Sequence, residues 1–189
     1  MKTTFLAMVF VIAAPLFAAD PVSTYFDGEL KEAEHDAVGL AQAMPADKYN
    51  FSPDSAGIKG AQFKGVRTFA QQAKHMATII YMVSAAALGE KPPVNIGKGD
   101  NGPDSLTTKD QIVTYLKGAF AYGHKSIATL TAKNQLEKVK GPFGGDMMRL
   151  EAASMVTWHT FDHYGQMVVY ARMNGVVPPS SQPPPSAAK

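Results

Sequence analysis

The sequence contains no cysteine among its 189 residues. This absence excludes disulfide bonds, zinc sites built from thiolates, iron–sulfur clusters, covalently attached haem and a cysteine nucleophile. It also excludes acylation of an N-terminal cysteine. The redox state of the protein's compartment is therefore not indicated by cysteine usage.

Charged residues are also scarce, at 18% of the chain with a formal net charge of +2. The lysines are scattered singly and form neither the runs nor the basic stripe that binding to a phosphate backbone requires. We therefore expect no nucleic-acid partner. A hydrophobic content of 46% rules out the composition of a disordered protein, and the length suits one compact domain.

Long apolar runs are few, and the first lies near the N-terminus. Lys2 precedes an uncharged apolar run over residues 5–14, and the small residues Ala18 and Ala19 follow it. This order is typical of a secretory signal peptide, here residues 1–19. The run is shorter than the roughly 20 residues of a membrane-spanning helix, so we expect a periplasmic or secreted protein without stable membrane insertion. A retained N-terminal anchor is the alternative.

The remaining sequence lacks a series of strand patterns. Instead, apolar residues recur at steps of three and four, which is typical of amphipathic helices. Stretches rich in Gly, Pro, Asn and Asp separate these segments. The helices are expected over residues 23–44, 63–88, 107–137 and 147–173.

This pattern predicts an all-α fold, a four-helix bundle that occupies one domain over residues 22–179. Metal and ligand sites of such bundles are built from side chains on facing helices. The second helix becomes apolar nearly all round from Met76 to Leu88 and should lie deep in the bundle. Residues 180–189 contain three prolines and are predicted to be a disordered tail.

The histidines are the most informative residues, and there are five: His35, His75, His124, His159 and His163. His159 and His163 are one helical turn apart, so both imidazoles can reach a single ion. His75 is the best third ligand, because it lies where its helix becomes apolar and an unpaired buried imidazole is costly. Three histidines leave an open coordination position, and imidazole suits zinc, nickel, iron or copper better than magnesium or calcium.

Other readings of these residues remain open. A chance pair of histidines on one helix is the alternative to a metal site, and haem held by a methionine and a histidine is another. Thr160 stands where a metalloprotease has its general-base glutamate, which disfavours that mechanism. His35 is expected in solvent, and His124 is expected to pack or support without binding metal. Asp162 and Gln166 are either exposed or orient a ligand histidine.

The last helix carries a family resemblance. The run His159-x-x-x-His163-Tyr164-Gly165-Gln166, followed by Tyr170-x-Arg172-x-Asn174-Gly175-x-x-Pro178-Pro179, resembles the final helix of the DinB/YfiT-like superfamily. The resemblance covers residues 22–179. It implies a four-helix bundle, often dimeric, that binds zinc, nickel or a similar ion. The histidines corresponding to the family's ligands are His75, His159 and His163.

What the resemblance implies about activity is broader. Members include thiol-dependent transferases, isomerases and proteins regarded as metal-dependent hydrolases. We therefore expect an exported DinB-family protein with one divalent ion, acting as a metal-dependent hydrolase or transferase on a small-molecule substrate of unknown identity. Export fits a hydrolase better, because thiol cosubstrates are chiefly cytosolic. The alternative is a non-catalytic, metal-binding or metal-stabilised bundle. A homodimer is expected from the resemblance, and no general base is evident.

Overall fold

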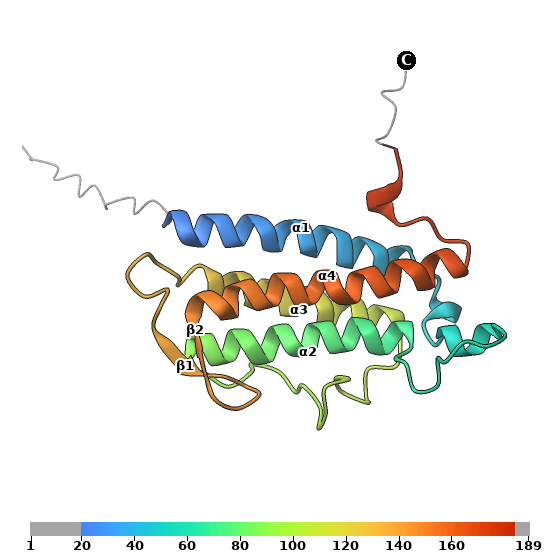
Figure 1. Cartoon of the computed structure of the whole chain (residues 1–189), viewed down its shortest axis with the longest axis horizontal. Helices are drawn as coiled ribbons and strands as arrows, with labels where there is room; N and C mark the ends of the chain where they lie inside the picture. Colours follow the sequence, from blue (N-terminus) through green and yellow to red (C-terminus); the bar gives the residue numbers. More distant parts are fainter. Residues whose placement is uncertain (1–19, 184–189) are drawn as a thin grey trace, which may run out of the picture.

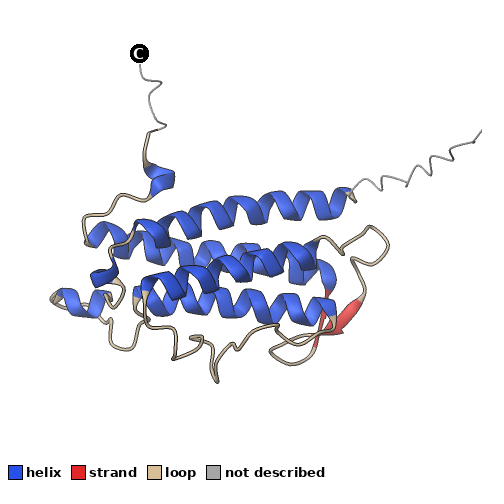
Figure 2. Ribbon diagram, turned by 180° about the vertical axis from the view of Figure 1, so that it is seen from behind, coloured by secondary structure: helices blue, strands red, loops and turns tan. Residues whose placement is uncertain are grey.

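The computed structural model describes residues 20–183, and these form a bundle of four α-helices with a short hairpin (Figures 1 and 2). The helices and strands are α1 (Pro21–Ala43), α2 (Phe69–Leu88), α3 (Lys109–Ile127), β1 (Lys138–Lys140), β2 (Asp146–Met148) and α4 (Arg149–Met173). Three short 3-10 turns complete the described chain: η1 (Ala46–Lys48), η2 (Pro53–Ala56) and η3 (Pro179–Ser181). The expectation of a helical bundle is confirmed.

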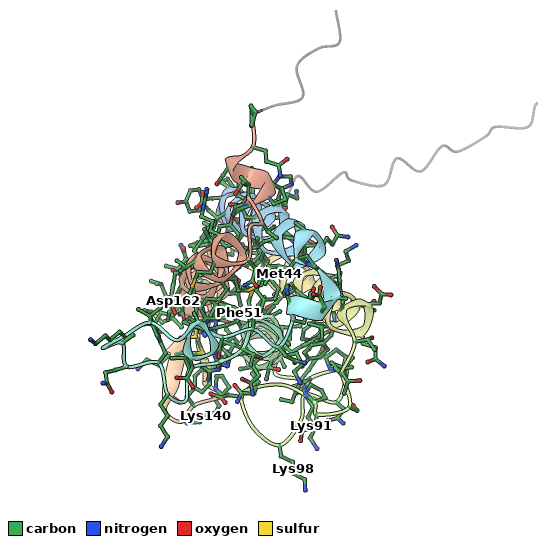
Figure 3. The ribbon with its side chains drawn as sticks, turned by 90° about the vertical axis from the view of Figure 1, so that its right-hand side faces the viewer. Met44, Phe51, Lys91, Lys98, Lys140 and Asp162 are labelled. Carbon is green, nitrogen blue, oxygen red and sulfur yellow. The ribbon has the colours of Figure 1, made fainter. Side chains whose placement is uncertain are left out.

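Helix α2 lies between α3 and α4, and α1 packs on the other side of the same two helices. Viewed from the end of the bundle, side chains fill the space between the four helices (Figure 3). Every residue of α2 from Gln72 to Tyr81 is buried, which agrees with the prediction that this helix is the deepest. The largest fully buried side chains include Phe69, Phe120, Leu30, Leu40, Met76 and Ile80.

Helix α2 starts six residues later than the sequence pattern predicted. The hydroxyl of Thr68 accepts a hydrogen bond from the Gln71 amide at 3.2 Å, and the Gln71 side chain accepts one from the Thr68 amide at 2.9 Å. This reciprocal capping box satisfies backbone donors that the first turn leaves unpaired, so it sets the start of the helix at Phe69. His75 consequently lies in the second turn of α2.

Helix α3 ends at Ile127, ten residues before the predicted end. Beyond it, the Asn134 side chain accepts from the Thr131 amide at 2.7 Å, and the Thr131 hydroxyl accepts from the Asn134 amide at 3.2 Å. The side-chain nitrogen of Asn134 also donates to the Thr129 backbone carbonyl at 2.9 Å. These local bonds offer the backbone an alternative to the helix, which the apolar spacing did not reveal.

The sequence pattern predicted no series of strands, and the structure adds one short hairpin of six residues to the bundle. Strands β1 and β2 pair antiparallel, with Lys138 opposite Met148 and Lys140 opposite Asp146. Gly144 and Gly145 adopt φ of 92° and 76° in the connecting turn, a region that favours glycine. The hairpin leads directly into α4, which therefore begins at Arg149.

The structure describes part of the predicted tail but none of the predicted signal peptide. The signal peptide predicted over residues 1–19 lies outside the described residues. Within residues 20–183, no helix combines the length and hydropathy needed to cross a membrane. Ser180 and Ser181, the first residues of the expected tail, belong to η3, which packs against α1. Residues 184–189 lie outside the described part.

Candidate metal centre

His75 on α2 faces His159 and His163 on α4 in the interior of the bundle. The ring centre of His75 is 5.0 Å from that of His159 and 4.5 Å from that of His163, and the latter two are 4.4 Å apart. His75 and His163 are each only 6% exposed. The three imidazoles that the sequence analysis selected therefore converge.

The nitrogen positions fit a single ion. The Nε2 atoms of His159 and His163 are 3.2 Å apart, and one nitrogen from each of the three rings lies within 4.8 Å of the others. Nitrogens bound to one tetrahedral zinc ion at about 2.0–2.1 Å lie roughly 3.4 Å apart. The α4 pair is already close to that separation, and the His75 nitrogen lies within 4.8 Å of both.

The orientation of His163 is set by a glutamine on the facing helix. Its Nδ1 donates a hydrogen bond to the Gln72 side-chain oxygen at 2.7 Å, which places the proton on Nδ1 and leaves Nε2 free to bind an ion. The amide nitrogen of Gln72 in turn donates to the Gln166 side chain at 2.8 Å. A chain of two hydrogen bonds therefore holds this ligand in its binding tautomer.

His75 is oriented by the backbone of the connection between α2 and α3. Its Nδ1 donates to the Asp100 carbonyl at 2.6 Å, so its Nε2 is again the unprotonated nitrogen. The Asp100 carboxylate and the Asn101 side chain accept hydrogen bonds from Arg67 at 2.8 and 2.6 Å. Arg67 thus anchors the segment whose carbonyl positions the histidine.

A glycine lets this segment approach α2 closely. Gly102 has a φ of +74°, and a Cβ built on it would lie 2.9 Å from the Lys74 Cβ. The ammonium group of Lys74 donates to the Pro103 carbonyl at 3.0 Å. Any larger residue at position 102 would push the segment outward and move the Asp100 carbonyl away from His75.

His159 is the ligand with the least support. Its Nδ1 is buried and has no hydrogen-bond partner among the described residues. Its Nε2 faces the unprotonated Nε2 of His163, so in the metal-free protein it donates the hydrogen bond between them. To bind an ion through Nε2 as a neutral imidazole, His159 would carry its proton on Nδ1 instead.

Burial keeps all three imidazoles neutral. Desolvation, followed by repulsion from His163 and His75, lowers the pKa of His159 to about 4. Desolvation, with repulsion from His75, likewise lowers the pKa of His163 to about 4. Burial also lowers the pKa of His75, against the opposing effect of the Asp100 carbonyl. Neutral imidazole is the form that binds metal ions.

The other two histidines lie outside this group, as predicted. His35 is exposed on α1. Both ring nitrogens of His124 contact carboxylates of α1, Nδ1 with Asp27 at 2.5 Å and Nε2 with Glu34 at 3.2 Å. His124 therefore ties α3 to α1. Among residues 20–183, the three converging histidines form the one group of three potential ligands this close together.

The sequence analysis considered two polar residues as orienting groups for a ligand histidine. Gln166 orients one indirectly, and Asp162 forms no hydrogen bond with one. Gln166 reaches His163 through Gln72. Asp162, labelled in Figure 3, is 61% exposed, and its carboxylate is 3.7 Å from the His163 Nε2. Gln72 itself was missed, although its position three residues before His75 puts it on the same face of α2. The role of the Asp100 backbone carbonyl could not be recognised in the sequence, because every residue has a backbone carbonyl.

A sequence comparison now adds to this geometry. The family model of the DinB superfamily matches residues 29–167. The chain belongs to the DinB superfamily. No curated protein matches the chain. The DinB match includes all three converging histidines and both orienting groups on α2 and its following connection, so the resemblance seen in the last helix extends over most of the bundle.

The hydrogen bond from His163 to Gln72 can be tested in this DinB protein. Replacing Gln72 by leucine removes the acceptor and leaves the Nδ1 proton without a partner. We expect metal affinity to fall about 10- to 100-fold, as is usual when a group that orients a ligand is lost. Competition with a chromogenic chelator measures the affinity. Gln62→Leu, at an exposed position, is the control, and an equal affinity of both variants would contradict the assigned role.

Proposed function

We propose that the protein is an exported DinB-family protein that binds one divalent metal ion through His75, His159 and His163. The observation that carries the proposal is the convergence of three neutral imidazoles, two of them with their Nε2 atoms 3.2 Å apart. Two of the three rings are held with Nε2 unprotonated by partners that lie outside the ligand set. If these histidines were merely packed in the core, their Nε2 atoms would not need to be unprotonated and directed at a common point.

Zinc or nickel is the ion we propose. All three ligands are imidazoles, which suit these borderline ions better than the hard cations calcium and magnesium. The carboxylate of the exposed Asp162, 3.7 Å from the His163 Nε2, is an additional oxygen donor on α4. Three protein ligands leave coordination positions for small molecules, which distinguishes the set from a closed four-ligand structural site.

We further propose that the bound ion serves a metal-dependent hydrolase or transferase reaction on a small molecule. When bound, such an ion supplies Lewis-acid activation of an oxygen ligand. His159 is the least buried of the three histidines, so access is from its side. Asp162 is the candidate proton acceptor, because the Asp100 carboxylate is engaged by Arg67, whereas the Asp162 carboxylate makes only long contacts, to Gln166 at 3.5 Å and to the His163 Nε2 at 3.7 Å.

The second candidate function is a non-catalytic bundle that the metal stabilises or that sequesters metal. The near-complete burial of His75 and His163, each 6% exposed, favours this alternative because it narrows access to the ion. The two candidates differ in one measurable property, which is whether the ion accepts a ligand from solution.

Cobalt substitution separates the two. Cobalt(II) in the site should give a visible spectrum, and added azide or acetohydroxamate should change it if a coordination position is open. A spectrum that does not respond to either ligand would support the non-catalytic bundle and reject the enzyme. His163→Ala, loaded in the same way, is the control, because a spectrum from that variant would place the cobalt elsewhere.

Export is the part of the proposal that rests on residues 1–19 alone. The mass of the mature protein tests it, since cleavage after about residue 19 removes the positively charged start and the apolar run. Recovery of the intact chain from a membrane fraction would instead support a retained anchor. The homodimer that the family resemblance implies stays a prediction.

A further inference from the structure

An apolar cavity of about 570 Å³, widely open to solvent, lies between α2, α3 and the connection that joins them. This connection runs along the outside of the bundle (Figure 1). The cavity is on the side of α2 that meets α3, whereas the histidine centre is on the side that meets α4. Its lining includes Tyr81, Val94, Leu106, Thr114, Tyr115 and Gly118. Sites for small organic molecules typically have volumes of 300–1,000 Å³.

The walls are built from buried aromatic rings. Tyr81 is 4% exposed and Tyr115 is 8% exposed, and their ring centres are 5.3 Å apart. Tyr122 continues the array behind Tyr81, at 5.7 Å between ring centres. Flat, rigid walls of this kind suit a planar apolar molecule.

One of these tyrosines has a hydroxyl group that forms no hydrogen bond with another residue. The Tyr115 hydroxyl is bonded to the Thr78 hydroxyl at 3.0 Å, and the Tyr122 hydroxyl donates to Glu90 at 3.2 Å. The Tyr81 hydroxyl has no partner among the described residues. The Tyr81 oxygen is not one of the solvent-inaccessible polar atoms that lack a partner, so it is open to solvent from the cavity and free to bond a ligand.

A glycine places that hydroxyl at the cavity wall. A Cβ built on Gly118 would lie 2.5 Å from the Tyr81 oxygen, so only glycine leaves the oxygen its present position. Gly118 also lines the cavity. The absence of a side chain at this point of α3 therefore leaves the Tyr81 hydroxyl beside the open space.

The charges around the cavity exclude an anionic ligand. No lysine, arginine or histidine is among its lining residues, and its single charged lining residue is Asp110, which is exposed at the start of α3. An anion would lose hydration without gaining a counter-charge. A neutral molecule avoids this cost.

We propose that this cavity binds an uncharged, largely apolar small molecule that accepts a hydrogen bond from the Tyr81 hydroxyl through an oxygen atom. The volume sets the size of the ligand, the tyrosine rings select a planar apolar body, and the unpaired hydroxyl selects the acceptor. The site is independent of the proposed metal centre.

The neutral fluorophore 6-propionyl-2-(dimethylamino)naphthalene is a suitable probe, because it is planar and carries a carbonyl acceptor, and its emission reports the polarity around it. Titration into the full-length protein should give saturable, blue-shifted emission. Thr114→Trp places a large side chain in the cavity and should weaken binding at least tenfold. Lys133→Trp, at an exposed position in the connection that follows α3, should leave binding unchanged. Val94→Trp is a second blocking variant from the opposite wall, should the first fold poorly.

The hydroxyl is tested by a matched pair of tyrosine variants. Tyr81→Phe should weaken probe binding roughly five- to tenfold, the usual effect of one lost hydrogen bond. Tyr122→Phe removes the hydroxyl of a similarly buried tyrosine that does not line the cavity, and should have no effect. The site is overturned if the probe shows no saturable binding. It is also overturned if neither of the two blocking variants, Thr114→Trp and Val94→Trp, weakens binding. Equal binding by Tyr81→Phe and the unaltered protein overturns the role of the hydroxyl.

Discussion

His163→Ala should abolish stoichiometric metal binding. The variant loses one of three nitrogen donors, and its effect should exceed the about 10- to 100-fold loss expected for the Gln72 variant, which only disturbs a ligand's orientation. His159→Ala and His75→Ala should behave in the same way. Metal content after dialysis, measured by plasma mass spectrometry, gives the stoichiometry, and chelator competition gives the affinity.

His35→Ala is the matched control for these variants, because His35 is an exposed histidine on α1 and far from the converging rings. It should retain full metal content. A buried substitution can also destabilise the fold, so helical content and the thermal midpoint of each variant should be compared in the presence of a chelator. Equal metal content in the His35, His159 and His163 variants would rule out the assigned ligand set.

Metal binding should persist to a lower pH than free histidine would allow. The pKa of His159 and of His163 is lowered to about 4, so protons should compete with the ion only as the pH approaches that range. In a site made of exposed histidines, protons would begin to compete with the ion below about pH 6.5. Retention of the ion at pH 5.5, followed by loss near pH 4, is the expected result of an equilibrium dialysis series.

The same lowered pKa values predict how the stability of the metal-free protein varies with pH. An unfolded histidine binds a proton below about pH 6.5, whereas the folded His159 and His163 remain neutral down to about pH 4. In this window the unfolded state holds more protons, so the free energy of unfolding falls as the pH falls. It should be independent of these groups above pH 6.5.

Thermal unfolding between pH 4 and 7.5 in the presence of a chelator measures this effect. The variant His163→Gln provides the control, because it removes one of the contributing groups and should show a shallower dependence on pH. Identical pH profiles for the two proteins would mean that the buried imidazole does not contribute. Stability that rises as the pH falls would contradict the neutral state assigned to the centre.

Much of the centre could be predicted from the sequence, because helical geometry is local. The spacing of His159 and His163 places them on one face of any helix that contains both. The apolar surroundings of His75 in the sequence indicate burial, and a buried imidazole needs a partner. These arguments require only a helix period and a hydropathy pattern, which are both properties of short segments.

The orienting groups could not be predicted in this way. The Asp100 carbonyl reaches His75 because the connection lies against α2 at Gly102, and a carbonyl has no distinguishing side chain. Gln72 is separated from His163 by 91 residues, so their hydrogen bond exists only after α2 and α4 pack together. The unpaired hydroxyl of Tyr81 is likewise a property of the packed α2–α3 interface.

Element ends and the hairpin also depended on contacts that apolar spacing does not encode. The Thr131–Asn134 turn ended α3 early. The pairing of β1 with β2 used residues predicted as a loop, together with Met147 and Met148, which were predicted to begin the last helix. The sequence by itself determined an all-α bundle and the choice of three histidines, because both follow from periodicity along single helices. Only the tertiary structure decided which nitrogen of each ring faces the centre and where the apolar cavity lies, because these depend on which groups meet across helices distant in the chain.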